Sequence, residues 1–252
     1  MENNLVSIIT PSYKSKKYIQ ATIESVKAQT YKNWEMIIVD DCSTDGSVEY
    51  IEELVEGEKR IKLIALKSNV GAAEARNNAL SIVNGRFVAF LDSDDMWDVN
   101  KLKIQVEFML KNKCEFSYTA YRVCDDSGSN IHGEIPVPST INYKQYLANT
   151  IIGCLTVMLD MEKLGKVKMP NIRSSHDMAL WADILSEIDM AYGVNVPLAT
   201  YRLVGTSNTA NKWKASKDVW GIYRNHLKLN LLASSLYFVQ YAFNAVKKRN
   251  YK

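Results

Sequence analysis

The sequence contains little of what would mark several common classes of protein. Its 252 residues include 11 glycines and 5 prolines, too few for a collagen-like or linker-dominated chain. The four cysteines form no CxxC pair and the three histidines complete no zinc-ligand pattern, so we interpret the cysteines as reduced structural thiols. Neither GxGxxG nor GxxxxGKS/T occurs, which argues against a dinucleotide-binding or P-loop protein.

No segment has the features of a signal peptide or a membrane-spanning helix. Residues 1–4 include no basic residue, and the apolar run at 5–9 is too short for either. We therefore expect a cytoplasmic protein. Basic and acidic residues nearly balance, 31 against 28, and the net charge of +3 does not favour nucleic acid as a partner. With 47% hydrophobic residues, the chain can bury one large core.

Segments that favour strands and helices alternate through the first half of the chain. Apolar or β-branched runs typical of strands lie at 6–10, 36–39, 61–66 and 87–91. Segments with apolar residues at helical spacing lie at 19–26, 47–55, 72–83 and 98–110. This alternation predicts an α/β fold in which a mostly parallel, doubly wound sheet is flanked by helices.

The alternation loosens after about residue 115. The elements that we expect there are a strand at 116–123, an apolar strand at 154–159, a helix beginning near residue 175 and a strand ending at Arg202. From Lys212 onward the apolar spacing is helical almost to the end. We therefore predict an α/β domain at residues 1–210 and a helical extension at residues 211–252.

Carboxylates follow two of the predicted strands. Asp40 and Asp41 come after the second strand, and Asp92 and Asp94 come after the fourth. In open α/β sheets, ligands bind beyond the carboxyl ends of the strands. Like charges gathered there repel unless a cation compensates them, and Mg²⁺ or Mn²⁺ can bridge carboxylate and phosphate oxygens. Taken singly, each Asp has the alternative interpretation of a helix N-cap or turn residue.

Four segments, in this order and at these intervals, resemble the family 2 glycosyltransferases with the GT-A fold. They are VSIITPSY (6–13), IVDDCSTD (38–45), NVGAAEARN (69–77) and FLDSDD (90–95). The likeness covers roughly residues 5–210 and implies a GT-A-type, Rossmann-like, mostly parallel sheet flanked by helices. It also implies an inverting, metal-dependent enzyme. Such an enzyme moves a sugar from a nucleotide-sugar, by resemblance a UDP-sugar, to a hydroxyl of a saccharide or lipid-linked acceptor in cell-surface polysaccharide biosynthesis.

The resemblance assigns roles to individual residues of these segments. Those implied to bind the nucleotide-sugar are Thr10, Pro11, Tyr13, Asp40, Asp41, Arg76, Asp92, Ser93 and Arg202. The first three would line the nucleoside pocket, and either Asp41 or Asp40 would hold the uracil edge. Asp94 would bind the divalent metal, Mn²⁺ or Mg²⁺, on the diphosphate. Cys42 stands where glycine is frequent in the family, which predicts a less tight turn.

The resemblance also points to SSHDMALW at 174–181. In the family an acidic pair, often Glu-Asp, precedes Leu-Trp, and its Asp is the catalytic base. Here Asp177 keeps the position of the catalytic Asp, and His176 replaces the Glu. The role of His176 stays open, because it could be a substrate contact or an exposed residue without a role. A carboxylate at a helix N-terminus is stabilised by the helix dipole and suits proton acceptance from a sugar hydroxyl. The alternative is that Asp177 is only a first-turn acid.

Arg202 and the segment after it form the last part of the implied donor site. In related enzymes a Tyr-Arg or Arg-rich segment at this place closes over the bound diphosphate, and residues 205–208 suit such a closure. A surface salt bridge from Arg202 is the alternative interpretation.

Two other protein classes share parts of the pattern. Asp40, Asp41 and Asp92 also resemble the acidic site of a receiver-type signalling module, but a strand and helix precede Asp40 and the chain is about twice a receiver's length. Asp92 and Asp94 also resemble the Asp-x-Asp of haloacid dehalogenase-like phosphatases. Those enzymes place this motif on the first strand and follow it with Thr or Val where this chain has Met96.

The helical extension has an apolar stripe and a strong positive charge. The stripe consists of Trp220, Tyr223, Leu227, Leu231, Leu232, Leu236, Val239, Phe243 and Val246. Residues 211–252 carry nine basic and one acidic side chain, a net charge of +8, so the other 210 residues carry 22 basic and 27 acidic ones, a net charge of −5. We expect an interfacial helix on anionic lipid, and therefore a peripheral protein on the inner face of the cell membrane. The alternative is packing on the α/β domain or on a second subunit, which would make a homo-oligomer.

Overall fold

The computed structural model describes residues 4–205 and 212–248. Two sequence predictions fall elsewhere. The closing segment at 206–208 and the basic residues Arg249 and Lys252 lie outside the described residues.

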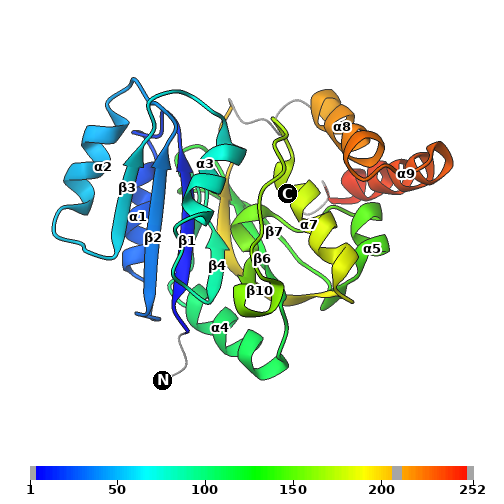
Figure 1. The fold of residues 1–252 in the computed structure, drawn as a ribbon, viewed down its shortest axis with the longest axis horizontal. Helices are drawn as coiled ribbons and strands as arrows, with labels where there is room; N and C mark the ends of the chain where they lie inside the picture. Colours follow the sequence, from blue (N-terminus) through cyan, green and yellow to red (C-terminus); the bar gives the residue numbers. More distant parts are fainter. Residues whose placement is uncertain (1–3, 206–211, 249–252) are drawn as a thin grey trace.

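A ten-stranded sheet forms the centre of the protein (Figure 1). Its strands are β1 (Val6–Ser12), β2 (Trp34–Asp40), β3 (Ile61–Ala65), β4 (Phe87–Phe90), β5 (Met96–Trp97), β6 (Phe116–Cys124), β7 (Ile131–Ile135), β8 (Thr140–Ile141), β9 (Met158–Asp160) and β10 (Ala191–Arg202). The order along the main path is β3-β2-β1-β4-β9-β6-β10-β5, with β7 paired to β6 and β8 to β10. The pairs formed by β1, β2, β3 and β4 are parallel, so their carboxyl ends meet at one edge.

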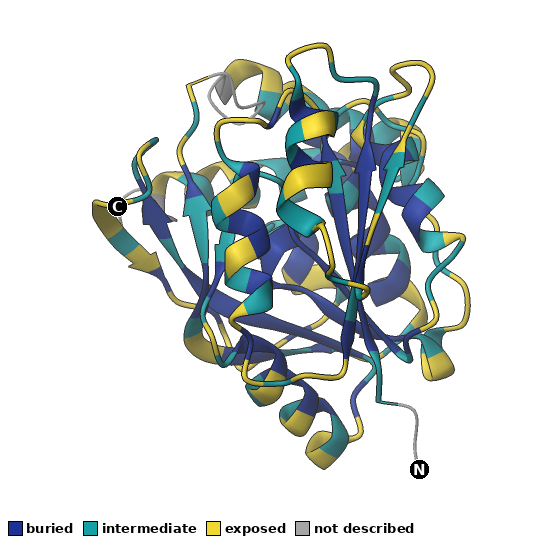
Figure 2. Ribbon diagram, turned by 90° about the vertical axis from the view of Figure 1, so that its left-hand side faces the viewer, coloured by how far each residue is buried: buried dark blue, intermediate teal, exposed yellow. Residues whose placement is uncertain are grey.

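Helices cover both faces of this sheet. They are α1 (Ile19–Lys27), α2 (Ser47–Val55), α3 (Ala72–Leu80), α4 (Lys101–Asn112), α5 (Tyr143–Ala148), the 3₁₀ helix η1 (Cys154–Thr156), α6 (Met161–Leu164), α7 (His176–Glu187), α8 (Lys212–Gly221), the π-helix η2 (Ile222–His226) and α9 (Leu231–Lys248). In Figure 2 the strands are mostly buried and the helices expose their outer faces. The expected α/β fold with a mostly parallel sheet flanked by helices is confirmed.

Alternate side chains of the strands build two hydrophobic cores, one on each face. In β1, Ile8 belongs to the core that contains Ile19, Ile23 and Val26 of α1, whereas Ile9 belongs to the core that contains the buried side chains of α3 and α7. This division follows from the two-residue period of a strand, which sends successive side chains to opposite faces. The apolar positions that the sequence predicted for strands and helices therefore form the two hydrophobic cores between the sheet and its helices.

The second half of the chain differs in part from the expected elements. The segment at 154–159 was expected to be one strand, but Cys154–Thr156 is a 3₁₀ helix and the strand β9 begins only at Met158. β9 runs antiparallel between β4 and β6, which closes the gap between the two parallel parts of the sheet. Short strands such as β5 and β8 contain two residues each and carry too little periodicity for a sequence prediction.

The C-terminal helices pack against α5 and α7. Ile222 and Tyr223 of η2 belong to the same core as α7, and the Tyr223 hydroxyl donates a hydrogen bond to the Leu147 carbonyl of α5. α9 donates from Asn244 Nδ2 to the Ala148 carbonyl at 3.0 Å. The boundary predicted at residue 210 stays a prediction. Within the described ranges, no helix has the length and apolar character needed to cross a bilayer.

The opposite face of α9 is apolar and exposed. Leu232 and Phe243 are 82% and 73% exposed, and the same face presents Leu236, Val239 and Val246. These positions follow steps of four and three residues, so they form one continuous stripe along the helix. Of the apolar stripe that the sequence predicted, Tyr223 is instead fully buried, because η2 turns it toward α5.

Candidate active site

Asp40 ties together the ends of β1 and β2. Its buried carboxylate accepts hydrogen bonds from Ser12 Oγ at 2.9 Å, from the Ser43 N–H at 2.8 Å and from Ser43 Oγ at 2.7 Å. Cys42, which lies between Asp40 and Ser43 in the chain, has a φ of 63°, the left-handed conformation that glycine adopts most easily. The turn thus keeps the conformation of a glycine turn although a cysteine occupies it.

Asp41 holds the loop that leads into α3. One of its carboxylate oxygens accepts the Val70 N–H at 2.7 Å, and the other accepts the Gly71 N–H at 2.8 Å. Asn69 adds a hydrogen bond from its side-chain amide to the Asp41 carbonyl at 3.0 Å. The N-terminus of α3 is therefore anchored directly beside the end of β2, and α3 carries the next functional side chain.

The residues predicted for the nucleoside pocket lie at the end of β1. Thr10 is fully buried, and its hydroxyl is one of the buried oxygen atoms that have no hydrogen-bond partner among the described residues. Pro11 is half-buried, and Tyr13 is 49% exposed. The backbone of Asp41 donates to the Ser12 carbonyl at 2.8 Å, which places these residues next to Asp41.

Arg76 of α3 connects the end of β4 to the start of α7. Its guanidinium is buried, pairs with the Asp92 carboxylate and donates from Nη1 to His176 Nε2 at 2.6 Å. Burial alone would lower the pKa of Arg76, but the charges of Asp92 and Asp177 outweigh it and raise that pKa. The predicted site residues Arg76, Asp92 and Asp177 thus lie in one electrostatic environment.

Three carboxylates crowd the segment after β4. Burial and the charge of Asp92 raise the pKa of Asp94 to about 6. Burial and the charges of Asp94 and Asp92 raise the pKa of Asp95 well above its ordinary value. Ser93 lies between them and is half-buried. Arg76 and Arg202 bring two positive charges to these three carboxylates, so the fully ionised segment keeps a net negative charge that a cation can offset.

Arg202, at the end of β10, is buried against this segment. Its backbone N–H donates to Asp95 Oδ1 at 2.9 Å, and its Nε donates to the Asp94 carbonyl at 2.8 Å. Its Nη1 donates to the Asp126 carbonyl at 2.9 Å, and the guanidinium stacks over Tyr18. Arg202 is 4% exposed and holds the backbone of the carboxylate segment, so its predicted contact with the donor stays a prediction.

Asp177 lies in the first turn of α7, directly after His176. Ser175, which precedes the helix, has a φ of 58°, a left-handed conformation that costs a non-glycine residue about 1 kcal/mol or more. Asp177 is half-buried and has no hydrogen bond to another described side chain that would occupy its carboxylate. A free carboxylate at a helix N-terminus is available as a proton acceptor.

The sequence left the role of His176 open, and the structure shows that it is buried. Burial and the charge of Arg76 lower the pKa of His176, so the neutral ring accepts the Arg76 hydrogen bond. The signal for this role was the replacement of Glu by His, because both side chains can accept a hydrogen bond from arginine. Cys154 of η1, which no motif marked, is buried near Arg76, Asp92 and Asp177.

The carboxylate segment suits a divalent metal that is bound together with a diphosphate. No group of three or more His, Cys, Asp or Glu side chains that would enclose a metal occurs at residues 4–205 or 212–248. Mg²⁺ and Mn²⁺ on nucleotide phosphates need only one or two protein carboxylates, because phosphates and waters supply the other ligands. Asp94, whose ionisation is opposed by burial and by Asp92, provides such a carboxylate.

The acidic segment after β4, the buried Arg76 and the Asp177 carboxylate of α7 lie together in one electrostatic environment. In open α/β sheets, ligands bind beyond the carboxyl ends of the parallel strands, where this acidic segment lies. The chain matches the sequence profile of Glycosyl transferase family 2 over residues 7–161, and it belongs to that family. It is therefore a glycosyltransferase, which sets aside the receiver and phosphatase alternatives.

Relatives resemble this chain over nearly its whole length. It is 49% identical to the putative teichuronic acid biosynthesis glycosyltransferase TuaG of Bacillus subtilis over 245 residues, 97% of each chain. It is 39% identical over 249 residues to the Escherichia coli UDP-Glc:alpha-D-GlcNAc-diphosphoundecaprenol beta-1,3-glucosyltransferase WfgD, covering 98% of this chain and 96% of that protein.

Solved structures show that the fold is shared with GT-A enzymes. TarS 1–349 of S. aureus in complex with UDP-GlcNAc matches with a TM-score of 0.72 and 20% identity, over 87% of this chain and 64% of that chain. The mannosyltransferase PcManGT from Pyrobaculum calidifontis, in complex with GDP-Man and Mn²⁺, matches with a TM-score of 0.71 and 16% identity, over 93% of this chain and 68% of that chain.

The Arg76–His176 hydrogen bond predicts a loss of stability when the histidine is removed. His176→Ala leaves a buried guanidinium N–H without an acceptor, so we expect the free energy of unfolding to fall by about 1–3 kcal/mol in urea denaturation. His176→Gln retains an acceptor oxygen and is expected to lose less. His132→Ala, at an exposed position of β7, serves as the control. Equal stability of His176→Ala and the wild type would contradict this role.

Proposed function

We propose that the protein is an inverting, metal-dependent glycosyltransferase that uses a UDP-sugar and acts on a saccharide, carried on a lipid, in cell-surface polysaccharide biosynthesis. The observation that carries this proposal is the contact of Arg76 with Asp92 and His176. Through that contact, the acidic segment after β4 and the free carboxylate of Asp177 belong to one site. The names of the two bacterial relatives, with a UDP-Glc donor and a diphosphoundecaprenol-linked acceptor in one of them, support the choice of substrates.

The end of β1 and the Asp41 region would bind the nucleoside of the donor. Tyr13 is exposed enough to lie against a base, and Thr10 and Pro11, which precede it at the end of β1, would line the pocket beside it. Asp41 uses one oxygen for Val70 and the other for Gly71, and each oxygen retains a lone pair for a base N–H. Both carboxylates are buried, and Asp40, which accepts three hydrogen bonds from Ser12 and Ser43, is better suited to hold this turn in place than to contact the base.

Asp94 would hold the divalent ion, and Asp92 and Ser93 would contact the sugar side of the donor. When bound, Mn²⁺ or Mg²⁺ supplies positive charge that stabilises the leaving diphosphate. Arg76 orients Asp92, because its buried guanidinium pairs directly with that carboxylate. Arg202 holds the backbone carbonyl of Asp94 and the side-chain carboxylate of Asp95, so the position of the ligand carboxylate depends on it.

Asp177 would accept the proton from the attacking acceptor hydroxyl. Its carboxylate is stabilised by the N-terminus of α7, and no described side chain occupies it through a hydrogen bond. One base on the side of the sugar opposite the diphosphate permits a single in-line displacement at the anomeric carbon. A single displacement inverts the configuration of that carbon, which is the stereochemical outcome that we propose.

A lipid-linked acceptor would bring the protein to a membrane surface. The exposed stripe of α9, defined by Leu232, Leu236, Val239, Phe243 and Val246, has the three- and four-residue spacing of an interfacial helix. The extension that contains it has a net charge of +8, which favours an anionic surface. We therefore propose peripheral binding to the inner face of the cell membrane through α9.

Asp177→Asn tests the assignment of the base. We expect sugar transfer to fall by at least about 100-fold, because general base catalysis typically contributes 10²–10⁴-fold. UDP binding and the far-ultraviolet circular dichroism spectrum should not change, since the substitution preserves the size of the side chain. The matched control is Asp189→Asn, at an exposed position after the same helix. Full transfer activity of Asp177→Asn would exclude Asp177 as the base.

Asp94→Asn and a pH series test the metal site. The pKa of Asp94 is raised to about 6, so protons compete with the metal below that pH. The affinity for Mn²⁺ in the presence of a UDP-sugar should therefore fall by about tenfold between pH 7 and pH 5. Titration calorimetry measures this affinity. A UDP-sugar is used because its diesterified phosphates keep a constant charge over this range. Asp94→Asn should abolish the metal-dependent binding, and unchanged binding in this variant would assign the metal to another residue.

The double variant Leu236→Ser and Phe243→Ser tests membrane binding by α9. Each side chain loses the stabilisation of about 1.5–3 kcal/mol that burial of a large apolar group provides, so co-sedimentation with anionic phospholipid vesicles should fall more than tenfold. Gln240→Ser, at an exposed polar position of the same helix, is the control. Unchanged sedimentation, or a changed oligomeric state in the double variant, would show that lipid does not cover this face.

A further inference from the structure

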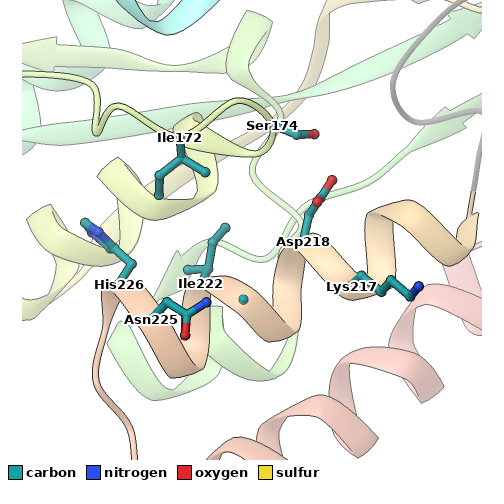
Figure 3. A pocket seen from close by; sticks show the side chains of 8 residues that line it. Ile172, Ser174, Lys217, Asp218, Ile222, Asn225 and His226 are labelled. Atoms are coloured by element: carbon teal, nitrogen blue, oxygen red, sulfur yellow. The ribbon is translucent and has the colours of Figure 1, made fainter.

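An open cavity of about 300 Å³ lies between the loop that leads into α7 and the first part of the C-terminal extension (Figure 3). Its volume is at the lower end of the range for small-ligand sites, ~300–1,000 Å³. It is separate from the carboxylate segment after β4. The residues that matter for its chemistry are Ile172 and Ser174 of the loop, Asp218 of α8, and Ile222, Asn225 and His226 of η2.

The loop that forms one wall of the cavity leads into α7, the helix that carries the proposed base. Ser174 lines the cavity, and Asp177 follows three residues later at the start of α7. Asn77 of α3 holds the beginning of this segment, since it accepts the Met169 N–H at 2.8 Å and donates to the Met169 carbonyl at 3.0 Å. The cavity and the base are therefore held in a defined relation to α3.

Asp218 provides an unused hydrogen-bond acceptor at this cavity. Its Oδ2 atom is buried and has no hydrogen-bond partner among the described residues. In Figure 3 the carboxylate points toward Ser174 across the opening between α8 and the loop. Asp218 as a whole is half-buried and lines the cavity, so its carboxylate can accept a hydrogen bond from a ligand hydroxyl.

The remaining walls combine fixed polar groups with apolar surface. His226 is oriented by Asp183 of α7, whose two carboxylate oxygens lie 2.9 and 2.8 Å from Nε2. Ile172 and Ile222 supply apolar surface, and Asn225 supplies an amide. A saccharide has the complementary chemistry, because its hydroxyls pair with carboxylate, amide and hydroxyl groups while its C–H face contacts aliphatic side chains.

We propose that this cavity binds the saccharide of the acceptor and directs one of its hydroxyls toward Asp177. The inference rests on the proposed function, which it deepens by naming the place of the acceptor. The same extension continues into α9, whose exposed apolar stripe would contact the membrane that holds the lipid of such an acceptor. Acceptor recognition then belongs to α8 and η2, whereas donor recognition belongs to the sheet edge.

Gly221 allows the cavity to be filled without strain in the backbone. It lines the cavity and has a helical φ of −59°, which any residue adopts. A Cβ at this position would have Asn225 Nδ2 at 3.9 Å as its nearest neighbour, an ordinary contact distance. Gly221→Leu therefore projects a bulky side chain at the cavity, and Gly221→Ala is its matched control.

The test is direct binding of an acceptor analogue. The probe is an α-GlcNAc diphosphate on a short alkyl chain, measured by titration calorimetry in the presence of UDP. We expect Gly221→Leu and Asp218→Ala to bind it at least about tenfold more weakly than the wild type, while Gly221→Ala and Asp189→Asn bind it equally well. UDP affinity should be the same in all variants, which also shows that each is folded.

Two results would overturn the proposal. One is an unchanged affinity for the probe in Gly221→Leu and Asp218→Ala, and the other is a wild type that binds UDP but not the probe. Failure of the wild type to transfer sugar, with the binding differences intact, would instead count against the proposed function. Binding and transfer therefore separate the two proposals.

Discussion

The buried guanidinium of Arg76 is the interaction on which the geometry of the active site depends. It joins α3, the segment after β4 and the start of α7 through Asp92 and His176. A buried charge is tolerated only when it is paired and hydrogen-bonded, so both partners must stay where they are. Together with Arg202, Arg76 offsets only part of the charge that Asp92, Asp94 and Asp95 carry when ionised. Burial and the charge of Asp92 raise the pKa of Asp94, and the excess of carboxylates makes the segment a place for a cation.

Two strained residues stand next to the carboxylates that the site presents. Cys42 follows Asp41, and Ser175 precedes α7 and its Asp177, each with φ near 60°. Such conformations persist only where surrounding contacts determine them. At Cys42 these contacts are the hydrogen bonds of Asp40 and Asp41, and at Ser175 the contact is the neighbouring His176–Arg76 bond. Contacts of neighbouring residues therefore stabilise the orientation of the Asp41 and Asp177 carboxylates.

The C-terminal extension links the catalytic centre to the exposed stripe of α9. Its first part, α8 and η2, packs against α5 and α7, and Tyr223 is fixed to α5. One face of α9 packs against α5, and no described part of the chain covers the other face. A lipid-linked substrate has a polar and an apolar end, and the extension offers a polar cavity and an apolar stripe along one continuous segment.

The alternation of strands and helices could be predicted from the sequence, as could the motifs that contain Arg76, Asp92, Asp94 and Asp177, because these signals lie within short segments. The sequence prediction was incomplete in two places. It missed the two-residue strands and assigned strand to Cys154–Thr156, where an apolar run does not distinguish the two structures. Only the tertiary structure decided that His176 is buried on Arg76, 100 residues away in the chain, and that Arg202 is enclosed beneath the acidic segment. Such contacts depend on how distant elements pack, and no local pattern records them.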